Sequence, residues 1–99
     1  MNAIVMDAIK IFYPLSDTRE SLDKVVLEWL DFKATNLEEK VMAFERKYRM
    51  EFKEFNEKIK KEGASFDEED DWIDWGDYID LLEELKKCRR DILYQLRIR

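Results

Sequence analysis

The strongest constraint on the fold is the absence of glycine and proline between Asp17 and Lys61. In this stretch, apolar side chains recur at alternating spacings of three and four residues. That spacing places them on one stripe of a helix, whereas a strand requires a spacing of two. The pattern predicts a long helix over residues 17–61, with Ser16, Asp17 and Glu20 able to form a capping box at its start. The stripe comprises Leu27, Leu30, Ala34, Leu37, Val41, Phe44, Tyr48 and Phe55.

A break is expected inside this helix. The apolar repeat slips near residues 49–52, because Glu51 takes a position that an apolar residue should hold and Phe52 continues the stripe. A bend there is favoured over one at the second possible cap, which begins at Thr35. An unbroken helix of this length would span about 68 Å, whereas a compact domain of this size has a radius of gyration of about 13 Å. The helix therefore bends, or it protrudes and requires a partner.

A second long helix is predicted over residues 66–97. Gly63 follows two lysines and is typical of a helix end, and Ser65 with Glu68 forms a capping box for the next helix. A short turn therefore joins two antiparallel helices, and Gly76 inside the second one admits a close neighbour. The apolar face of this helix comprises Trp72, Trp75, Tyr78, Ile79, Leu82, Leu85, Cys88, Ile92 and Leu96.

The N-terminal residues 1–15 form a separate short element. Several are β-branched, which is typical of strands, but Asp7 and Lys10 are three apart, as on one face of a helix. A short helix ended by Pro14 is favoured, and a strand stays open. The sequence thus predicts a single all-α domain over residues 1–99, built as a long antiparallel helical hairpin with a short N-terminal element.

The composition excludes many functions. The chain has 99 residues and no histidine, so Ser-His-Asp and Cys-His catalytic groups and histidine metal sites are impossible, and two glycines cannot form a phosphate-binding loop. We predict no catalytic residue, no cofactor and no resident metal. Because the single Cys88 cannot form an intramolecular disulfide and no apolar run approaches the roughly 18 residues of a membrane span, a cytoplasmic protein without membrane contact is expected.

Charge is distributed in bands. Residues 62–84 hold eleven acidic residues and no basic one, while residues 40–61 hold eight basic and four acidic ones. In a hairpin these two segments lie side by side, so internal pairing is favoured as the explanation, together with the helix dipole. The alternative is a surface that holds a small basic protein, with the rings at the rim of the interface. Its candidate residues are Asp70, Asp71, Trp72, Asp74, Trp75 and Tyr78.

Two other binding functions receive less support. Pairs of acids spaced by three, such as Glu28 with Asp31 and Glu68 with Asp71, could bind Mg²⁺, as in the all-α nucleotide pyrophosphohydrolases, which use two such pairs on facing helices. However, Glu28 lacks the neighbouring second Glu that this family usually carries. Direct nucleic-acid binding is not expected, because the chain is acidic overall and its basic patches match no groove-reading motif.

Two segments resemble small helical proteins of archaea and bacteria, some of which look like the antitoxin-like partner encoded beside a toxin-like reading frame. The segments are residues 37–55 (LEEKVMAFERKYRMEFKEF) and 69–85 (EDDWIDWGDYIDLLEEL). Arg49 stands where those proteins lead us to expect glycine. The resemblance implies a non-enzymatic interaction module that binds a small protein, and a structural subunit of a larger assembly is the plainer alternative.

Two helices alone bury little apolar surface, so we expect a second copy to complete a helical bundle as a homodimer. The residues predicted to mediate self-association lie on the two apolar stripes. They are Leu30, Leu37, Val41, Phe44, Tyr48, Leu82, Leu85 and Ile92.

Overall fold

A computed structural model describes residues 18–98, which form three α-helices: α2 (Thr18–Tyr48), α3 (Phe52–Glu62) and α4 (Phe66–Ile98). The predicted all-α class is confirmed for these residues, which contain no strand. The predicted N-terminal element and the capping box at Ser16 and Asp17 lie outside the described residues.

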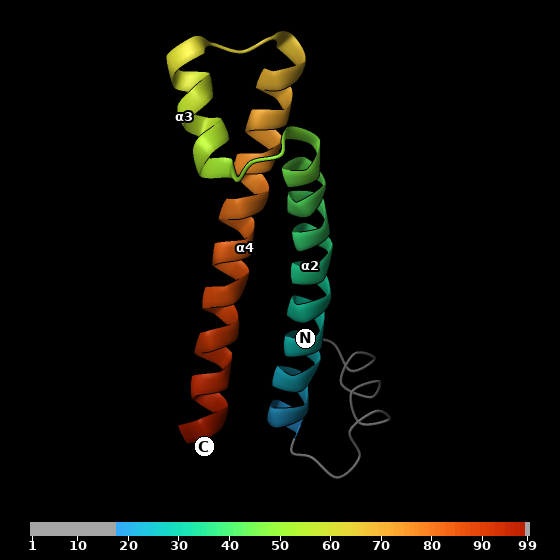
Figure 1. The fold of residues 1–99 in the computed structure, drawn as a ribbon. Helices are drawn as coiled ribbons and strands as arrows, with labels where there is room; N and C mark the ends of the chain where they lie inside the picture. Colours follow the sequence, from blue (N-terminus) through green and yellow to red (C-terminus); the bar gives the residue numbers. More distant parts are fainter. Residues whose placement is uncertain (1–17, 99) are drawn as a thin grey trace.

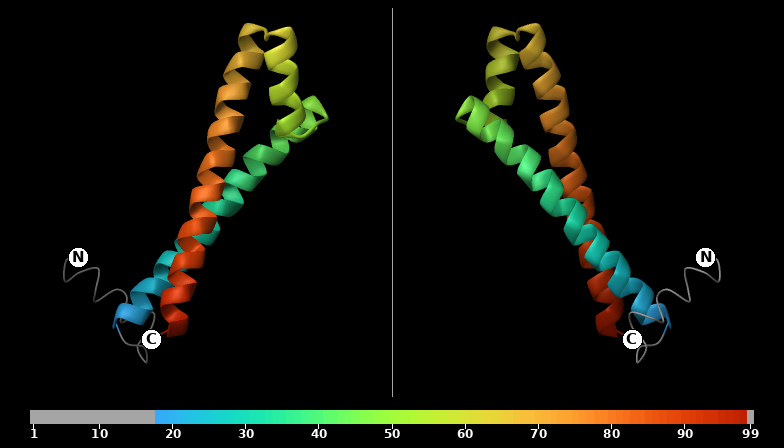
Figure 2. Two further views of the ribbon diagram at one scale, coloured as in Figure 1. Left: turned by 90° about the vertical axis from the view of Figure 1, so that its left-hand side faces the viewer. Right: turned by 90° about the vertical axis from the view of Figure 1, so that its right-hand side faces the viewer.

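The molecule is an elongated rod. Helices α2 and α4 lie side by side and run in opposite directions, and α3 packs beside the first half of α4 (Figure 1). Figure 2 shows that α2 is inclined across α4, so that the C-terminal end of α2 diverges and α3 occupies the third side. The principal extents are 57 × 27 × 21 Å and the radius of gyration is 18.8 Å, compared with about 13 Å for a compact domain of this length. A large fraction of each helix therefore faces solvent.

Helix α2 ends at Tyr48 and α3 begins at Phe52, which is the segment where the apolar repeat slips. Arg49 has a φ of 54°, in the left-handed region that favours glycine and that often terminates helices. Arg49 thus ends the helix at the position where the resemblance leads us to expect glycine. Glu51 then caps α3 through its backbone alone, since its side chain makes no capping hydrogen bond.

The turn between α3 and α4 contains both predicted signals. The Gly63 N–H donates to the Ile59 carbonyl at 2.9 Å, and Gly63 has a φ of 76° and a ψ of −178°. The Ser65–Glu68 capping box is confirmed, because the Glu68 N–H donates to Ser65 Oγ at 3.2 Å and the Ser65 N–H donates to Glu68 Oε1 at 3.1 Å. The latter bond lowers the pKa of the Glu68 carboxyl. These bonds fix where α4 begins.

The core lies where the three helices meet. Phe55 and Ile59 of α3 and Trp75 of α4 are buried. The Trp75 ring centroid is 5.3 to 6.0 Å from the ring centroids of four aromatic side chains, namely Phe44, Tyr48, Phe52 and Phe55. Gly76 admits the close neighbour that the sequence suggested, because a Cβ at this position would lie 3.2 Å from Cζ of Phe52. The aromatic cluster holds α3 against α4.

Candidate protein-interaction site

The partner-binding prediction for Trp75 is wrong. Its side chain has 0% of its surface exposed and forms the centre of the aromatic cluster, so it cannot serve as a surface contact. The physical reason is its place on the apolar stripe of α4, which faces both α2 and α3. Because the neighbouring residues are acidic, the sequence suggested that the whole segment is exposed, but the Trp75 side chain is not.

Asp71 is half-buried and bound within the chain. Its Oδ2 accepts a hydrogen bond from Lys47 Nζ at 2.5 Å and another from the Tyr48 hydroxyl. These two bonds lower the pKa of Asp71, and the bond to Asp71 raises the pKa of Lys47. Burial, followed by the bond to Asp71, raises the pKa of Tyr48. The cluster ties the C-terminal end of α2 to α4.

Trp72 and Tyr78 are half-buried, and each already has a contact within the chain. The Trp72 Nε1–H donates to Asn56 Oδ1 at 2.9 Å. Lys40 Nζ lies 5.0 Å from the centroid of the Tyr78 ring, which is within cation–π range. Both rings therefore serve the internal structure, and only parts of them can face a partner.

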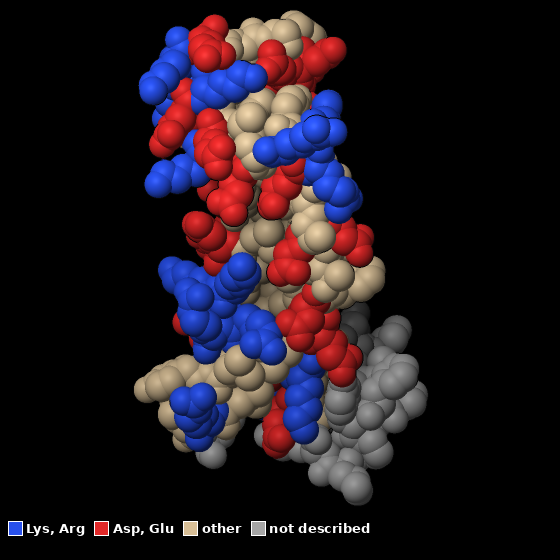
Figure 3. All heavy atoms as spheres, in the orientation of Figure 1, with Lys and Arg blue, Asp and Glu red and all other residues tan. Residues whose placement is uncertain are grey.

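Asp70 and Asp74 are exposed, so their assignment as partner contacts stays a prediction. Figure 3 shows acidic and basic side chains interleaved over the end of the rod that holds α3 and the start of α4. Nevertheless, among residues 18–98 only one ion pair, between Lys47 and Asp71, joins the acidic segment 62–84 to the basic segment 40–61. The expectation that much of the banding reflects internal pairing is therefore wrong, and most of the acidic charge faces solvent.

The predicted self-association residues mainly pack within the chain. Leu30 and Leu82 are buried, and Val41, Phe44 and Tyr48 pack against the aromatic cluster. For Leu30 and Leu82 the assignment to a dimer interface is wrong, because their side chains are buried within the chain. Val41, Phe44 and Tyr48 are only half-buried, so their assignment stays a prediction. The half-buried residues Leu37, Leu85 and Ile92 keep part of their surface exposed.

An apolar groove runs between α2 and α4 on one side of these stripes. Its volume is about 290 Å³. Trp29 is 54% exposed and Leu81 is 51% exposed. The apolar spacing did not predict them, because each lies next in sequence to a residue of a stripe, Leu30 or Leu82, and is not part of the stripe itself. A search for large apolar residues beside the stripes could have found them. The groove is lined by Trp29, Lys33, Asn36, Leu37, Lys40, Leu81 and Leu85.

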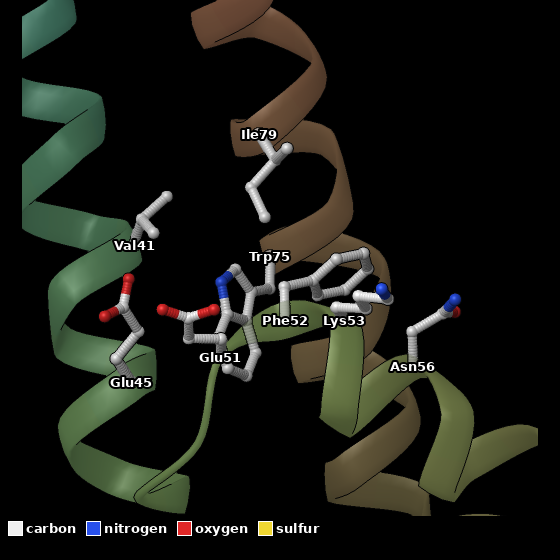
Figure 4. Close-up of a pocket in the computed structure, with 8 residues that line it drawn as sticks. All are labelled: Val41, Glu45, Glu51, Phe52, Lys53, Asn56, Trp75 and Ile79. Atoms are coloured by element: carbon white, nitrogen blue, oxygen red, sulfur yellow. The ribbon is translucent and has the colours of Figure 1, made fainter.

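A second cavity, the junction pocket, lies where α2, α3 and α4 meet (Figure 4). Its volume is about 470 Å³, and two carboxylates and one ammonium lie in its wall. The Nε1–H of Trp75 is buried without a hydrogen-bond partner. No sequence pattern indicates this pocket, because its walls come from three separate elements. Its lining residues are Val41, Glu45, Glu51, Phe52, Lys53, Asn56, Trp75 and Ile79.

Over residues 18–98, no group of three or more His, Cys, Asp or Glu side chains has a geometry that could hold a metal ion. The pyrophosphohydrolase alternative requires acid pairs on facing helices, but Asp31 instead accepts a hydrogen bond from Arg89 Nε at 2.8 Å. The described helices also include none that is both long enough and apolar enough to cross a membrane.

Comparison with protein-family models, with curated proteins and with solved structures finds no match to this chain. The resemblance to antitoxin-like helical proteins therefore stays a prediction.

Proposed function

We propose that this chain is a cytoplasmic, non-enzymatic protein–protein interaction module, antitoxin-like in that it binds a small basic protein, and that it works as a homodimer. The observation that carries the proposal is the apolar groove between α2 and α4, where Trp29 and Leu81 remain half-exposed. Contiguous exposed apolar surface of this kind is typical of protein interfaces.

The shape of the rod supports a need for partners. Apart from the three-helix junction, α2 and α4 form a single layer, and neither has a second helix behind it among the described residues. Large apolar side chains are exposed on several sides. They include Trp29, Phe32, Met42, Phe66, Ile73, Leu81, Tyr94 and Ile98.

The charges around the groove favour a second copy as its occupant. Lys33 and Lys40 line the α2 wall. On α4, Asp77 and Glu84 are exposed and lie four residues before and three residues after Leu81, so they flank it on the helix surface. If two grooves face each other with α2 of one copy over α4 of the other, lysines meet carboxylates and the apolar residues meet in the centre. The groove is therefore complementary to itself, as a two-fold interface requires.

Light scattering coupled to size-exclusion chromatography tests the dimer. The unaltered chain should elute at twice its mass of 12.1 kDa at micromolar concentration, and Leu81→Asp should be a monomer. Met42→Asp is the matched control, because Met42 is also 51% exposed but does not line the groove. This control should remain a dimer. A folded monomer for the unaltered chain would refute self-association.

The exposed acids of α4 support the basic partner. Asp70 and Asp74 are exposed, and the whole chain has a formal net charge of −6, so it attracts basic proteins at long range. We expect a small basic protein to co-purify from the native host and to be identified by mass spectrometry. Its capture should be lost with Asp70→Lys and Asp74→Lys combined and kept with Leu81→Asp. Equal capture by the charge-reversed chain would refute this contact.

A further inference from the structure

The break between α2 and α3 contains no helix-breaking residue. Residues 49–51 are Arg, Met and Glu, which all tolerate helices well, and neither glycine nor proline occurs between Asp17 and Lys61. Arg49 nevertheless adopts a φ of 54°, in the left-handed region that is unfavourable for residues with a side chain. The bend that Figure 2 shows at this point is therefore imposed by tertiary contacts and not by the local sequence.

The break also leaves backbone donors without helical partners. Within residues 18–98, the N–H groups of residues 49–51 donate to no backbone carbonyl, and the Glu51 side chain does not cap α3. In a straight helix these three donors would bond to the carbonyls of residues 45–47. Straightening would thus remove the left-handed residue and continue the helical hydrogen bonds through the break.

The aromatic cluster at Trp75 holds the bend in place. The centroid of the Trp75 ring is 5.4 Å from that of Phe44 in α2 and 5.3 Å from that of Phe55 in α3. A straight helix places residues 44 and 55 about 16 Å apart along its axis. This separation is too large for one indole to contact both rings at the observed distances. If the break straightens, Trp75 therefore keeps only one of these neighbours from its own chain.

Helix α3 is the neighbour that α4 keeps. Only residues 63–65 join these two helices, so they form a tight hairpin. The Trp72 Nε1–H donates to Asn56 Oδ1 at 2.9 Å, and the Phe52 ring lies against Gly76. These contacts do not depend on the break, which lies on the other side of α3. Straightening therefore separates α2 from an intact α3–α4 hairpin and uncovers the face of α4 that α2 had packed against.

We infer that residues 49–51 form a hinge that straightens, so that two copies of this chain exchange their α2 helices and form a domain-swapped dimer. In this dimer, α2 of each copy packs on α4 of the other. Trp75 again lies against Phe44 and Phe55, which now belong to different chains. The occupant of the uncovered face is a second copy, because an identical chain reproduces every contact of the closed form. Short hinges under strain favour such exchange.

The exchange goes beyond the proposed function, because the groove dimer joins two closed chains and leaves the break bent. Leu81→Asp separates the two associations, since Leu81 lines the groove but not the junction pocket beside the break. This chain is unfolded in urea, refolded at millimolar concentration and diluted to micromolar concentration for size-exclusion chromatography. We expect a dimer fraction that persists after dilution, because reversal requires Trp75 to unpack. A chain that is entirely monomeric after this treatment would overturn the inference.

Substitutions at residue 49 in the Leu81→Asp chain test the hinge. Arg49→Gly should lower the dimer fraction about tenfold or more, because glycine adopts a left-handed φ freely and weakens a straight helix. Arg49→Ile should raise it about threefold or more, since a β-branched residue is strongly disfavoured at this φ. Arg46→Ile is the matched control, because Arg46 is exposed within α2. A dimer fraction that is independent of residue 49, or that both isoleucine changes raise equally, would contradict a hinge at this position.

Cross-linking in the Leu81→Asp chain identifies which copy supplies α2. Asp31 of α2 and Arg89 of α4 form an exposed ion pair at 2.8 Å that does not involve the break. The test chain carries Asp31→Cys, Arg89→Cys and Cys88→Ser, and a short bismaleimide joins the two thiols. On denaturing gels, the dimer fraction should give covalent dimers and the monomer fraction only links within one chain. A dimer fraction linked only within single chains would exclude the exchange.

The two associations fail independently. Loss of the exchange with an intact dimer of the unaltered chain refutes the hinge alone. A monomeric unaltered chain refutes the groove dimer and leaves the exchange standing, because the exchange is measured after the groove contact has been removed.

Discussion

The aromatic cluster predicts that Trp75→Ala is severely destabilising. Trp75 is 0% exposed and touches rings from both α2 and α3. Truncation of a buried tryptophan to alanine typically costs about 3–5 kcal/mol, because apolar surface is lost and a cavity remains. Small domains are stabilised by roughly 5–15 kcal/mol in total, so we expect this single change to remove a large part of the stability.

The assay is urea unfolding followed by circular dichroism at 222 nm, at one fixed protein concentration because a dimer would make stability concentration-dependent. A loss of about 4 kcal/mol corresponds to a decrease in Tm of roughly 15–30 °C for a chain of this size.

The control is Ile73→Ala, which lies two residues earlier on α4 with half of its side chain exposed. Changes at such a surface position usually stay within about 0.5 kcal/mol. If Trp75→Ala lost no more stability than Ile73→Ala, the assignment of Trp75 to the core would be refuted.

Two further changes test the turn and the Lys47–Tyr48–Asp71 cluster. Gly63→Ala should lower the free energy of unfolding by about 1–3 kcal/mol. The reason is the backbone, because a φ of 76° with an extended ψ disfavours any residue with a side chain, even though no atom lies within 4 Å of the added Cβ. Unchanged stability in the same urea titration would contradict this. For Asp71, whose pKa is lowered by Lys47 and Tyr48, the stabilising contribution is complete above the unfolded-state pKa of about 3.9 and is lost as the pH falls through the folded-state pKa. The gap in unfolding free energy between the unaltered chain and Asp71→Asn should therefore be largest near neutral pH and shrink below about pH 4, and parallel pH profiles would count against the cluster.

Local signals in the sequence were sufficient for the helical elements. Spacings of three and four predicted helices, and the slip at Glu51 and Phe52 pointed to the segment where α2 gives way to α3. Ser65 and Glu68 form the capping box that their spacing predicts. These features could be found because each depends on residues within one or two helical turns.

The candidate surfaces could not be predicted in the same way. The sequence shows that Trp72, Trp75 and Tyr78 share a helix with many acids, but not which ring faces the other helices. The acidic surroundings suggested that Trp75 was a surface contact, whereas rings from both α2 and α3 pack against it and bury it completely. Trp29 and Leu81 were overlooked for the opposite reason, since the groove that they line exists only once α2 and α4 are placed side by side.

The amino-acid order by itself determined that this chain is helical, where α4 starts and which apolar stripes face inward, because periodicity and capping act over short distances along the backbone. Tertiary structure alone decided that the stripes of α2 and α4 cover each other and that Trp75 is enclosed by rings from two other helices. These outcomes depend on the angle between α2 and α4 and on the packing of α3 against α4, which arise from contacts between residues far apart in the sequence.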